Sequence, residues 1–225
     1  MSIRNQNILI VGGTSGLGFR LGVALSQGNK VIITGRNNPL QAGLEFRFLD
    51  LCEGSLSEQL DRFVEDLPSI DILVYAAGHY ERGALREMGD EQIIKMNNLY
   101  LLAPTLLLAR VLKKQERLSS FIALSSVSQW IAKPEESVYC SLKAGFGMLS
   151  NCLTLSPGVD KALVVAPARV NKKGQGGARE GENGKLDPDW IIEVILAEHE
   201  GIFRYKLLGI ARDPAKIEVR DIRLH

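Results

Sequence analysis

Three residues near the middle of the chain carry side chains that together could move a proton. Tyr139 and Lys143 are four positions apart, a spacing that places both side chains on one face of a helix, one above the other. Ser126 follows an apolar run, residues 121–124, that predicts a strand. A strand end with a hydroxyl, next to a helix with a phenol and an ammonium group, can form a small proton-transfer site. The alternative is purely structural: a half-buried tyrosine, a solvated lysine and a serine that caps a turn.

The composition limits the classes of partner. The chain has 225 residues, of which 45% are hydrophobic and 24% are charged, and its formal net charge is +1. These are ordinary values for a globular protein, and the length predicts one domain, residues 1–225, with a sizeable core. No long run of like charge supplies the basic field that would attract a nucleic acid or a membrane surface. Neither kind of partner is therefore expected.

The cysteines and the amino-terminal sequence indicate the cellular compartment of the protein. Cys52, Cys140 and Cys152 are scattered and lack metal-ligand spacing, so neither a disulfide framework nor a metal site is expected. The sequence before Ile8 is polar and has no apolar segment typical of a signal peptide. No window of roughly 18 uninterrupted apolar residues predicts a membrane span. We expect a cytoplasmic protein with reduced thiols.

A glycine-rich turn near the amino terminus has the context of a phosphate-binding loop. The apolar run at 8–11 predicts a strand covered on both faces, and a helical pattern extends from residue 17 to about residue 27. Glycines between them let the backbone turn tightly and approach a pyrophosphate, while the helix N-terminus offers N–H groups and partial positive charge. The residues that we expect around a dinucleotide here are Gly12, Thr14, Ser15, Gly16, Leu17 and Gly18.

The second predicted strand, residues 31–34, ends where the ribose of a dinucleotide normally lies. An acidic residue there would bind the 2′-hydroxyl of NAD and repel a 2′-phosphate, but the sequence has no acid between positions 31 and 41. It has Arg36, whose guanidinium can donate two parallel hydrogen bonds to a phosphate. We predict that NADP(H) is favoured over NAD(H). The alternative is a solvated loop arginine.

Strands and helices alternate along most of the chain. Further strands are predicted at 46–49, 71–75, 121–124 and 162–166, and the tail from 203 to 222 adds a final strand. Helices are predicted at 55–67, 90–114, 139–152 and 188–198, and Pro104 should kink its helix or remove one hydrogen bond. This order predicts a doubly wound, Rossmann-type α/β fold of three layers, with a mostly parallel sheet of about seven strands.

The carboxyl edge of such a sheet is where ligands bind. Ala76, Ala77 and Gly78 follow the strand at 71–75, and their small size would let a cofactor lie against the backbone. Pro167 ends the strand at 162–166 and is expected at the same edge. Residues 171–185 are rich in glycine and charge, and they predict a flexible loop that is either a lid over this edge or a plain surface loop.

Together these features resemble the short-chain dehydrogenase/reductase family in its compact form, over roughly residues 7–170. The turn Gly12-x-x-x-Gly16-x-Gly18 is similar to the family's TGxxxGxG motif, with Val11 in place of the usual threonine. The stretch 76–78 stands where the family has NAG, with alanine for asparagine. A single motif of this kind is weak, but several in one chain, each in the right structural context, are specific.

The active-site set also matches the family. Ser126 and Tyr139-x-x-x-Lys143 have the family's usual separation, and Asp50-Leu51 matches its adenine-site acid after the third strand. The resemblance implies hydride transfer between a nicotinamide and a carbonyl or alcohol substrate, with Tyr139 as general acid/base. Lys143 would favour the phenolate by its positive charge and hold the nicotinamide ribose. Ser126 would donate a hydrogen bond to the substrate oxygen.

The family's fourth active-site residue is an asparagine that is linked through water to the lysine. Two adjacent residues could fill this position. Asn97 fits better by pattern, because the apolar residues before it then fall on the family's apolar positions. Counting back from Ser126 favours Asn98 instead. We predict Asn97, with Asn98 as the alternative.

The sequence departs from the family's pattern after Pro167. Ala168 follows where the family usually has glycine, and the position of a threonine that anchors the nicotinamide amide falls near Lys172. These departures leave a second function open, a catalytically silent dinucleotide sensor on the same scaffold. The resemblance also implies a homodimer or homotetramer, and the leucine-rich run 99–108 is compatible with such an interface or with packing on the sheet.

Overall fold

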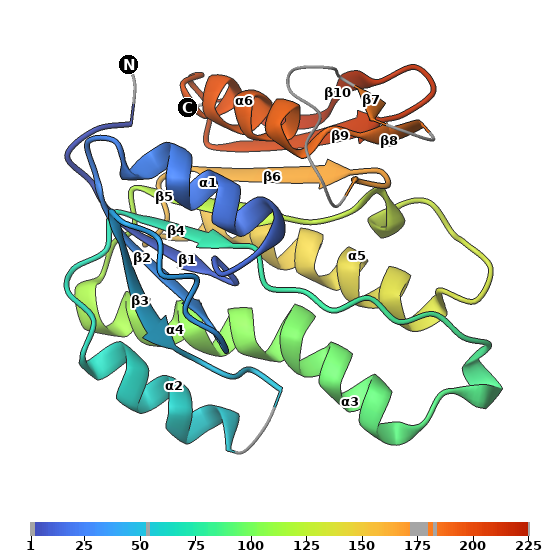
Figure 1. Cartoon of the computed structure of the whole chain (residues 1–225), viewed down its shortest axis with the longest axis horizontal. Coiled ribbons are helices and arrows are strands. Elements are labelled where there is room, and N and C mark those ends of the chain that lie inside the picture. Colours follow the sequence, from blue (N-terminus) through green and yellow to red (C-terminus); the bar gives the residue numbers. More distant parts are fainter. Residues whose placement is uncertain (1–2, 53–54, 172–179, 182–183, 225) are drawn as a thin grey trace.

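An eight-stranded sheet forms the centre of the protein in the computed structural model, which describes residues 3–52, 55–171, 180–181 and 184–224 (Figure 1). The strand order is β10-β9-β6-β5-β4-β1-β2-β3, and every neighbouring pair is parallel except β9 and β10. The strands are β1 (Asn7–Val11), β2 (Lys30–Gly35), β3 (Leu44–Phe48), β4 (Ile72–Tyr75), β5 (Ser120–Leu124), β6 (Ala162–Pro167), β9 (Tyr205–Ala211) and β10 (Lys216–Arg223).

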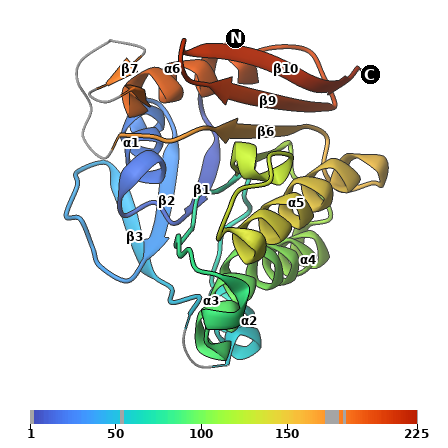
Figure 2. The same ribbon diagram turned by 90° about the vertical axis from the view of Figure 1, so that its right-hand side faces the viewer.

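Helices cover both faces of this sheet, which gives the three layers seen in Figures 1 and 2. Helices α1 and α6 pack on one face, and α2, α4 and α5 pack on the other. The helices are α1 (Gly16–Ser26), α2 (Leu56–Glu65), α3 (Asp90–Asn97), α4 (Ala103–Gln115), α5 (Ser137–Cys152) and α6 (Pro188–His199), with short turns η1 (Leu85–Glu87), η2 (Asn98–Leu102), η3 (Val127–Gln129) and η4 (Leu153–Leu155). Within the described ranges, no helix combines the length and the hydropathy needed to span a membrane.

The predicted doubly wound, mostly parallel fold is confirmed, with eight strands in the sheet instead of about seven. The difference lies in the tail, which forms two strands, because a short turn at 212–215 folds β10 back onto β9. The predicted loop at 171–185 lies largely outside the described residues, which there include only the paired strands β7 (Glu180–Gly181) and β8 (Lys185–Leu186) and single residues beside the gaps.

Burial explains why the apolar runs form the central strands. Every residue of β5 and β6 is buried, as is every residue of β4. Such runs suit strands that are covered by helices on both faces. The side chains separate into two clusters, one under each layer of helices, and the sheet between them brings all parallel strand ends to a common edge.

The helix predicted at 90–114 is interrupted by a π-helical turn, η2, and Pro104 lies in the first turn of α4. In a π-helical pattern the amide at position 104 would donate to the carbonyl of Leu99, but proline has no N–H. The buried hydroxyl of Tyr75 donates to this carbonyl instead, at 2.5 Å. A hydrogen bond from strand β4 thereby fixes the helical irregularity against the sheet.

In the glycine turn after β1, the backbone at Gly18 packs closely against the backbone at Gly12. A Cβ atom added at Gly18 would lie 2.4 Å from the Gly12 carbonyl oxygen and 2.9 Å from the Ala76 Cβ. Backbone cannot move aside as a flexible side chain can, so Gly18→Ala should lower the free energy of unfolding by about 1–3 kcal/mol. Urea denaturation of the two proteins measures this difference.

Gly145→Ala in α5 is the matched control. Its Cβ atom would meet only the Leu101 side chain at 3.5 Å, an ordinary contact, and alanine is the better helix former by up to about 1 kcal/mol. The control should therefore be neutral or stabilising. Equal stability of the two variants would contradict the close approach at Gly18.

Candidate active site

The structure brings Ser126, Tyr139 and Lys143 together at the carboxyl edge of the sheet. Ser126 follows β5 and caps the short turn η3, where its Oγ accepts a hydrogen bond from the Ser128 amide at 3.2 Å. Tyr139 and Lys143 lie on α5, which packs against β5 and β6. The helical spacing and the strand end predicted from the sequence therefore place the phenol, the hydroxyl and the ammonium group in one small region.

Tyr139 lies in a pocket of aromatic side chains. The Tyr80 and Tyr100 rings meet its ring edge-on, at centroid distances of 5.1 and 5.5 Å. Burial raises the pKa of the Tyr139 phenol, a hydrogen bond with the Ser126 hydroxyl lowers it in part, and the nearby charge of Glu136 raises it further. Without bound molecules, the phenol of Tyr139 is thus biased toward its protonated form.

Lys143 is almost fully enclosed, with 4% of its surface exposed. Its Nζ donates to the Leu124 carbonyl at 3.1 Å and lies 4.3 Å from the centroid of the Tyr100 ring. Burial lowers the pKa of Lys143 to about 7, so the ammonium group is about half deprotonated at neutral pH.

That Lys143 favours the Tyr139 phenolate stays a prediction. Its Nζ lies 5.9 Å from the centroid of the Tyr139 ring, and the pKa of Tyr139 is raised rather than lowered. The reason is desolvation, since no carboxylate is paired with Lys143 among the described residues and only a carbonyl and aromatic faces compensate its charge.

The two candidate asparagines lie at the junction of α3 and η2. Asn97 is the last residue of α3, Asn98 is the first of η2, and both are half-buried. Both are close in sequence to Tyr100, which contacts Tyr139 and Lys143. Asn97 stays the prediction, with Asn98 as the alternative.

The turn after β1 has the shape of a cradle for an anion. Gly12 has φ +80°, and a Cβ there would lie 2.5 Å from the Ala77 backbone. Gly16 has φ +57° and open space where a Cβ would point, so the turn is accessible at this residue. Helix α1 begins at Gly16 with no acidic residue in its first turn and no side-chain cap from Ser15. These features fit a pyrophosphate at the helix N-terminus.

The other predicted cofactor residues line the same edge. Thr14 packs on Gly35, where a Cβ would lie 2.4 Å from the threonine Oγ1, and exposed Arg36 follows directly. Asp50 accepts a hydrogen bond from the Cys52 amide at 2.9 Å, and Leu51 is buried. After β4, Ala76 and Ala77 are half-buried and Gly78 is exposed. Leu17 lies in the first turn of α1, and Pro167 is the last residue of β6. The predicted amide-anchor position, Lys172, lies outside the described residues.

Sequence reasoning missed the role of Tyr100. Its hydroxyl donates to the His79 carbonyl at 2.8 Å and accepts from the His79 amide at 2.9 Å, so it ties the chain after β4 to η2. Its ring also contacts both Tyr139 and Lys143 in the site, at 5.5 Å between ring centroids and 4.3 Å from Lys143 Nζ. The sequence offers one weak signal, an aromatic residue within a run of leucines shortly after the asparagine pair.

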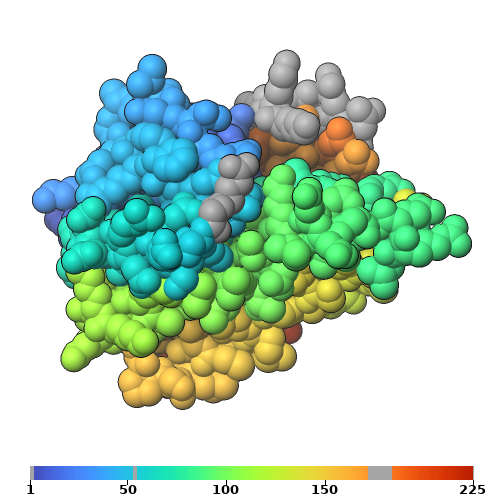
Figure 3. Space-filling view, turned by 90° about the horizontal axis from the view of Figure 1, so that it is seen from below, coloured from blue at the N-terminus to red at the C-terminus, as the bar shows by residue number. Residues whose placement is uncertain are grey.

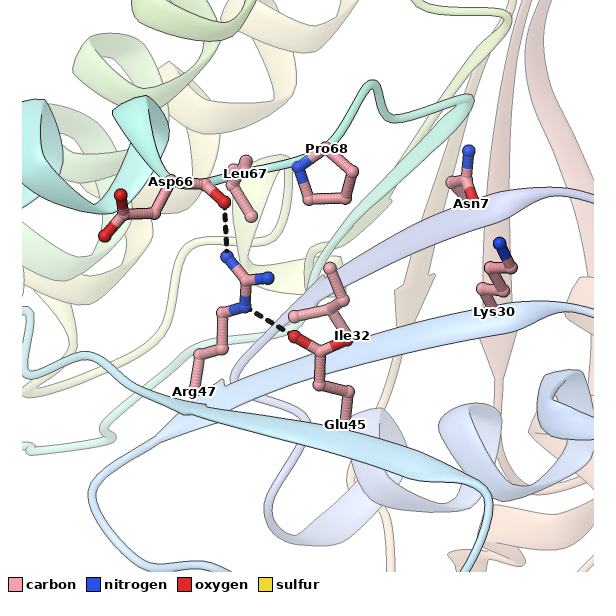
Figure 4. A pocket seen from close by; sticks show the side chains of 8 residues that line it. All are labelled: Asn7, Lys30, Ile32, Glu45, Arg47, Asp66, Leu67 and Pro68. Atoms are coloured by element: carbon pink, nitrogen blue, oxygen red, sulfur yellow. Dashed lines mark hydrogen bonds and ion pairs between the residues drawn. The ribbon is translucent and has the colours of Figure 1, made fainter.

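A hollow of about 550 Å³ lies elsewhere, at the amino ends of β1, β2 and β3 (Figure 4). The figure shows Arg47 bridging its two sides, with a bond from Nε to Glu45 at 2.7 Å and one from Nη1 to the Asp66 carbonyl at 2.8 Å. The charged groups in its centre are therefore paired with one another. Since the hollow is at the opposite edge from Ser126, it is not part of the proton-transfer site.

Comparison with known proteins agrees with the geometry. The sequence profile described as short chain dehydrogenase matches residues 6–180. A 3-oxoacyl-(acyl-carrier-protein) reductase of Rickettsia prowazekii (strain Madrid E) is 28% identical over 153 residues, which are 64% of this chain and 64% of the relative. The similar reductase of Rickettsia felis is also 28% identical, with the same coverage. The chain thus matches less than two thirds of the length of these relatives.

Solved structures show the same fold. A short-chain dehydrogenase from Streptomyces avermitilis superposes with a TM-score of 0.79 at 22% identity, covering 94% of this chain and 89% of that one. An alcohol dehydrogenase from the archaeon Thermococcus sibiricus, complexed with 5-hydroxy-NADP, has a TM-score of 0.77 at 21% identity, covering 94% and 97%. With the profile match over most of its length, the chain belongs to the short-chain dehydrogenases, a family of oxidoreductases.

Proposed function

We propose that the protein is an NADP(H)-dependent oxidoreductase that transfers a hydride between the nicotinamide and a carbonyl or alcohol substrate. The observation that carries this proposal is the meeting of Ser126, Tyr139 and Lys143 at the same sheet edge as the glycine cradle. The relatives support it, since they are named as a 3-oxoacyl reductase and an alcohol dehydrogenase complexed with an NADP derivative. Their names describe the same exchange between a carbonyl and an alcohol.

The protein's own residues would divide the work in reduction. Tyr139 donates its phenolic proton to the carbonyl oxygen, so its O–H bond breaks as the alcohol O–H forms. Ser126 donates a hydrogen bond to the same oxygen and stabilises the negative charge that develops there. Lys143 holds the nicotinamide ribose, and Asn97 holds the water next to the phenol. The dinucleotide supplies the hydride to the carbonyl carbon.

The raised pKa of Tyr139 suits this direction. A proton donor must be protonated at the working pH, and burial together with Glu136 keeps the phenol in that form. Alcohol oxidation needs the phenolate, which becomes populated only at higher pH. We therefore propose that carbonyl reduction is favoured at neutral pH and that oxidation improves as the pH rises.

Tyr139→Phe tests the assignment of the acid/base. We expect the turnover of a carbonyl substrate to fall by at least about 100-fold, because the ring remains and only the proton donor is lost. NADPH binding, followed by fluorescence titration, should be nearly unchanged. A substrate is found first by screening ketones and aldehydes for NADPH consumption.

Tyr205→Phe is the control, since it removes a buried hydroxyl on β9 at the opposite edge of the sheet. It should retain wild-type turnover. If Tyr139→Phe keeps most of its activity, the acid/base is another group. If the wild type binds NADPH and consumes none across a wide panel, the catalytically silent sensor is the better description.

Arg36→Ala tests the choice of dinucleotide. The guanidinium of Arg36 is exposed beyond β2, and we infer that it receives the 2′-phosphate. Loss of this charge-assisted contact should weaken NADPH binding by about 1.5–3 kcal/mol, roughly ten- to a hundredfold, and leave NADH binding unchanged. Arg117→Ala, which removes an exposed arginine paired with Asp160, should change neither affinity. Equal affinities of the wild type for NADPH and NADH would refute the role of Arg36.

We also propose that the protein is a homo-oligomer. The leucine-rich run does not carry this proposal, because Leu99, Leu107 and Leu108 are buried against the sheet. Met148, near the end of α5, is instead exposed, with 62% of its surface accessible. Figure 3 shows the face of the molecule formed by the chain from α2 to α5. Contacts between copies would cover such side chains.

Light scattering at micromolar protein concentration tests the assembly. We expect the mass of a dimer or tetramer, and Met148→Lys should shift the distribution toward monomer because a charge would be buried in the contact. A wild-type monomer under these conditions would refute the proposal.

A further inference from the structure

A polar cluster that the proposed chemistry does not use lies beside Ser126 and Tyr139. It consists of Tyr80, Ser128, Lys133 and Glu136. Glu136 immediately precedes α5, and its side chain is only 11% exposed although it is a carboxylate. Buried carboxylates are uncommon unless they are paired and hydrogen-bonded, so the partners of Glu136 define what it does.

The hydrogen bonds of this cluster run continuously from Ser126 to Glu136. Ser126 Oγ and Ser128 Oγ are 3.1 Å apart, and Ser128 Oγ and Glu136 Oε2 are 3.5 Å apart. Lys133 Nζ lies 2.9 Å from Ser128 Oγ and 3.6 Å from Glu136 Oε2. The Tyr80 hydroxyl donates to Glu136 Oε1 at 2.8 Å.

Donor and acceptor chemistry fixes the direction of these bonds. An ammonium group has only donors and a carboxylate has only acceptors. Ser128 Oγ therefore accepts from Lys133 and gives its own hydrogen to Glu136, which leaves its second lone pair for the hydrogen of Ser126. In this arrangement the Ser126 hydrogen points to Ser128, and a lone pair of Ser126 accepts from the Ser128 amide. Ser126 lowers the pKa of Tyr139 only when its hydrogen turns from Ser128 to the phenolate.

Several charged or titratable groups surround Tyr139, and each affects the charge that its phenol can carry. Tyr80, Tyr100 and Cys140 are neutral in their protonated forms, and burial lowers the pKa of Lys143 to about 7, which reduces its charge at neutral pH. Arg82 is engaged with Glu135 on the outer side of Tyr80. Around Glu136 the positive groups are Lys133, which is 35% exposed and therefore partly screened by water, and exposed Arg82, which also interacts with the Glu136 charge. The carboxylate is thus the main full charge that acts on the phenol.

We propose that Glu136 is a positioning residue of this site: through Ser128 it draws the Ser126 hydrogen away from Tyr139, and its charge favours the protonated phenol. The site is thereby set to give a proton to a carbonyl oxygen. A bound carbonyl oxygen then competes with Ser128 Oγ for the Ser126 hydrogen. The next bond of the chain, from Ser128 to Glu136, is long at 3.5 Å, so these hydrogen bonds rearrange easily. The inference deepens the proposed function, because it explains how one direction of the reaction is favoured.

Titration of the Tyr139 phenol tests this without any substrate. The chain has five tyrosines, so carbon-13 labelling at the tyrosine Cζ gives a short set of NMR signals, and Tyr139→Phe identifies the relevant one. In Glu136→Gln the midpoint of the Tyr139 titration should fall by about one pH unit, since a negative charge next to the phenolate is removed. Ser128→Ala should lower it as well, because the Ser126 hydrogen is then free to stabilise the phenolate.

Glu135→Gln is the matched control. It removes the same charge one residue away, from a side chain paired with Arg82 and outside the chain of hydrogen bonds. If Glu136→Gln and Ser128→Ala move the Tyr139 titration no further than this control, the proposal is wrong.

Measurements of turnover distinguish a failure of the positioning role of Glu136 from a failure of the oxidoreductase assignment. In Glu136→Gln, the rise of alcohol oxidation with pH should shift toward neutral pH together with the NMR midpoint. If the NMR midpoint falls as expected but no carbonyl or alcohol compound reacts with the wild type, Glu136 positions the phenol as proposed, and the oxidoreductase assignment fails instead. If turnover is found but the midpoint does not move, the positioning role fails alone.

Discussion

The hydrogen bond from Lys143 Nζ to the Leu124 carbonyl fixes the position of the proposed active site on the sheet. It joins α5 to the last residue of β5, so Tyr139, one helical turn earlier, is brought next to Ser126 just beyond the same strand. Because the contact is buried, it is favourable in geometry but costly in desolvation. The same burial that fixes the helix lowers the pKa of the lysine to about 7 and so reduces its positive charge at neutral pH.

Tyrosine hydroxyls provide the second set of contacts on which this edge depends. Tyr75 replaces the N–H that Pro104 lacks, and Tyr100 binds both the amide and the carbonyl of His79. One contact fixes the π-helical turn against the sheet, and the other fixes the chain after β4 against that turn. Tyr100 is thus held where its ring contacts both Lys143 and Tyr139.

The sequence predicted those parts of the fold and site that depend on local spacing. The four-residue interval between Tyr139 and Lys143, the glycines after β1 and the buried apolar runs each determine a local geometry, and the alternation of elements then brings strand ends together. What depends on tertiary contact was not predictable in this way. The pKa of Lys143 follows from burial, the direction of the Ser126 hydrogen follows from Glu136, and β10 follows from a turn that the tail pattern alone did not separate from one strand.

The electrostatic character of the site follows from two groups that act in the same sense. Burial reduces the positive charge of Lys143, and Glu136 places a negative charge near Tyr139. A more exposed lysine or a neutral residue at position 136 would each favour the phenolate and suit alcohol oxidation. Their combination keeps the proton on the phenol, at the end of a hydrogen-bonded chain whose direction is set by an obligate donor, Lys133, and an obligate acceptor, Glu136. Under the proposed function, the residues around Ser126, Tyr139 and Lys143, rather than these three alone, would therefore decide in which direction the site exchanges a proton.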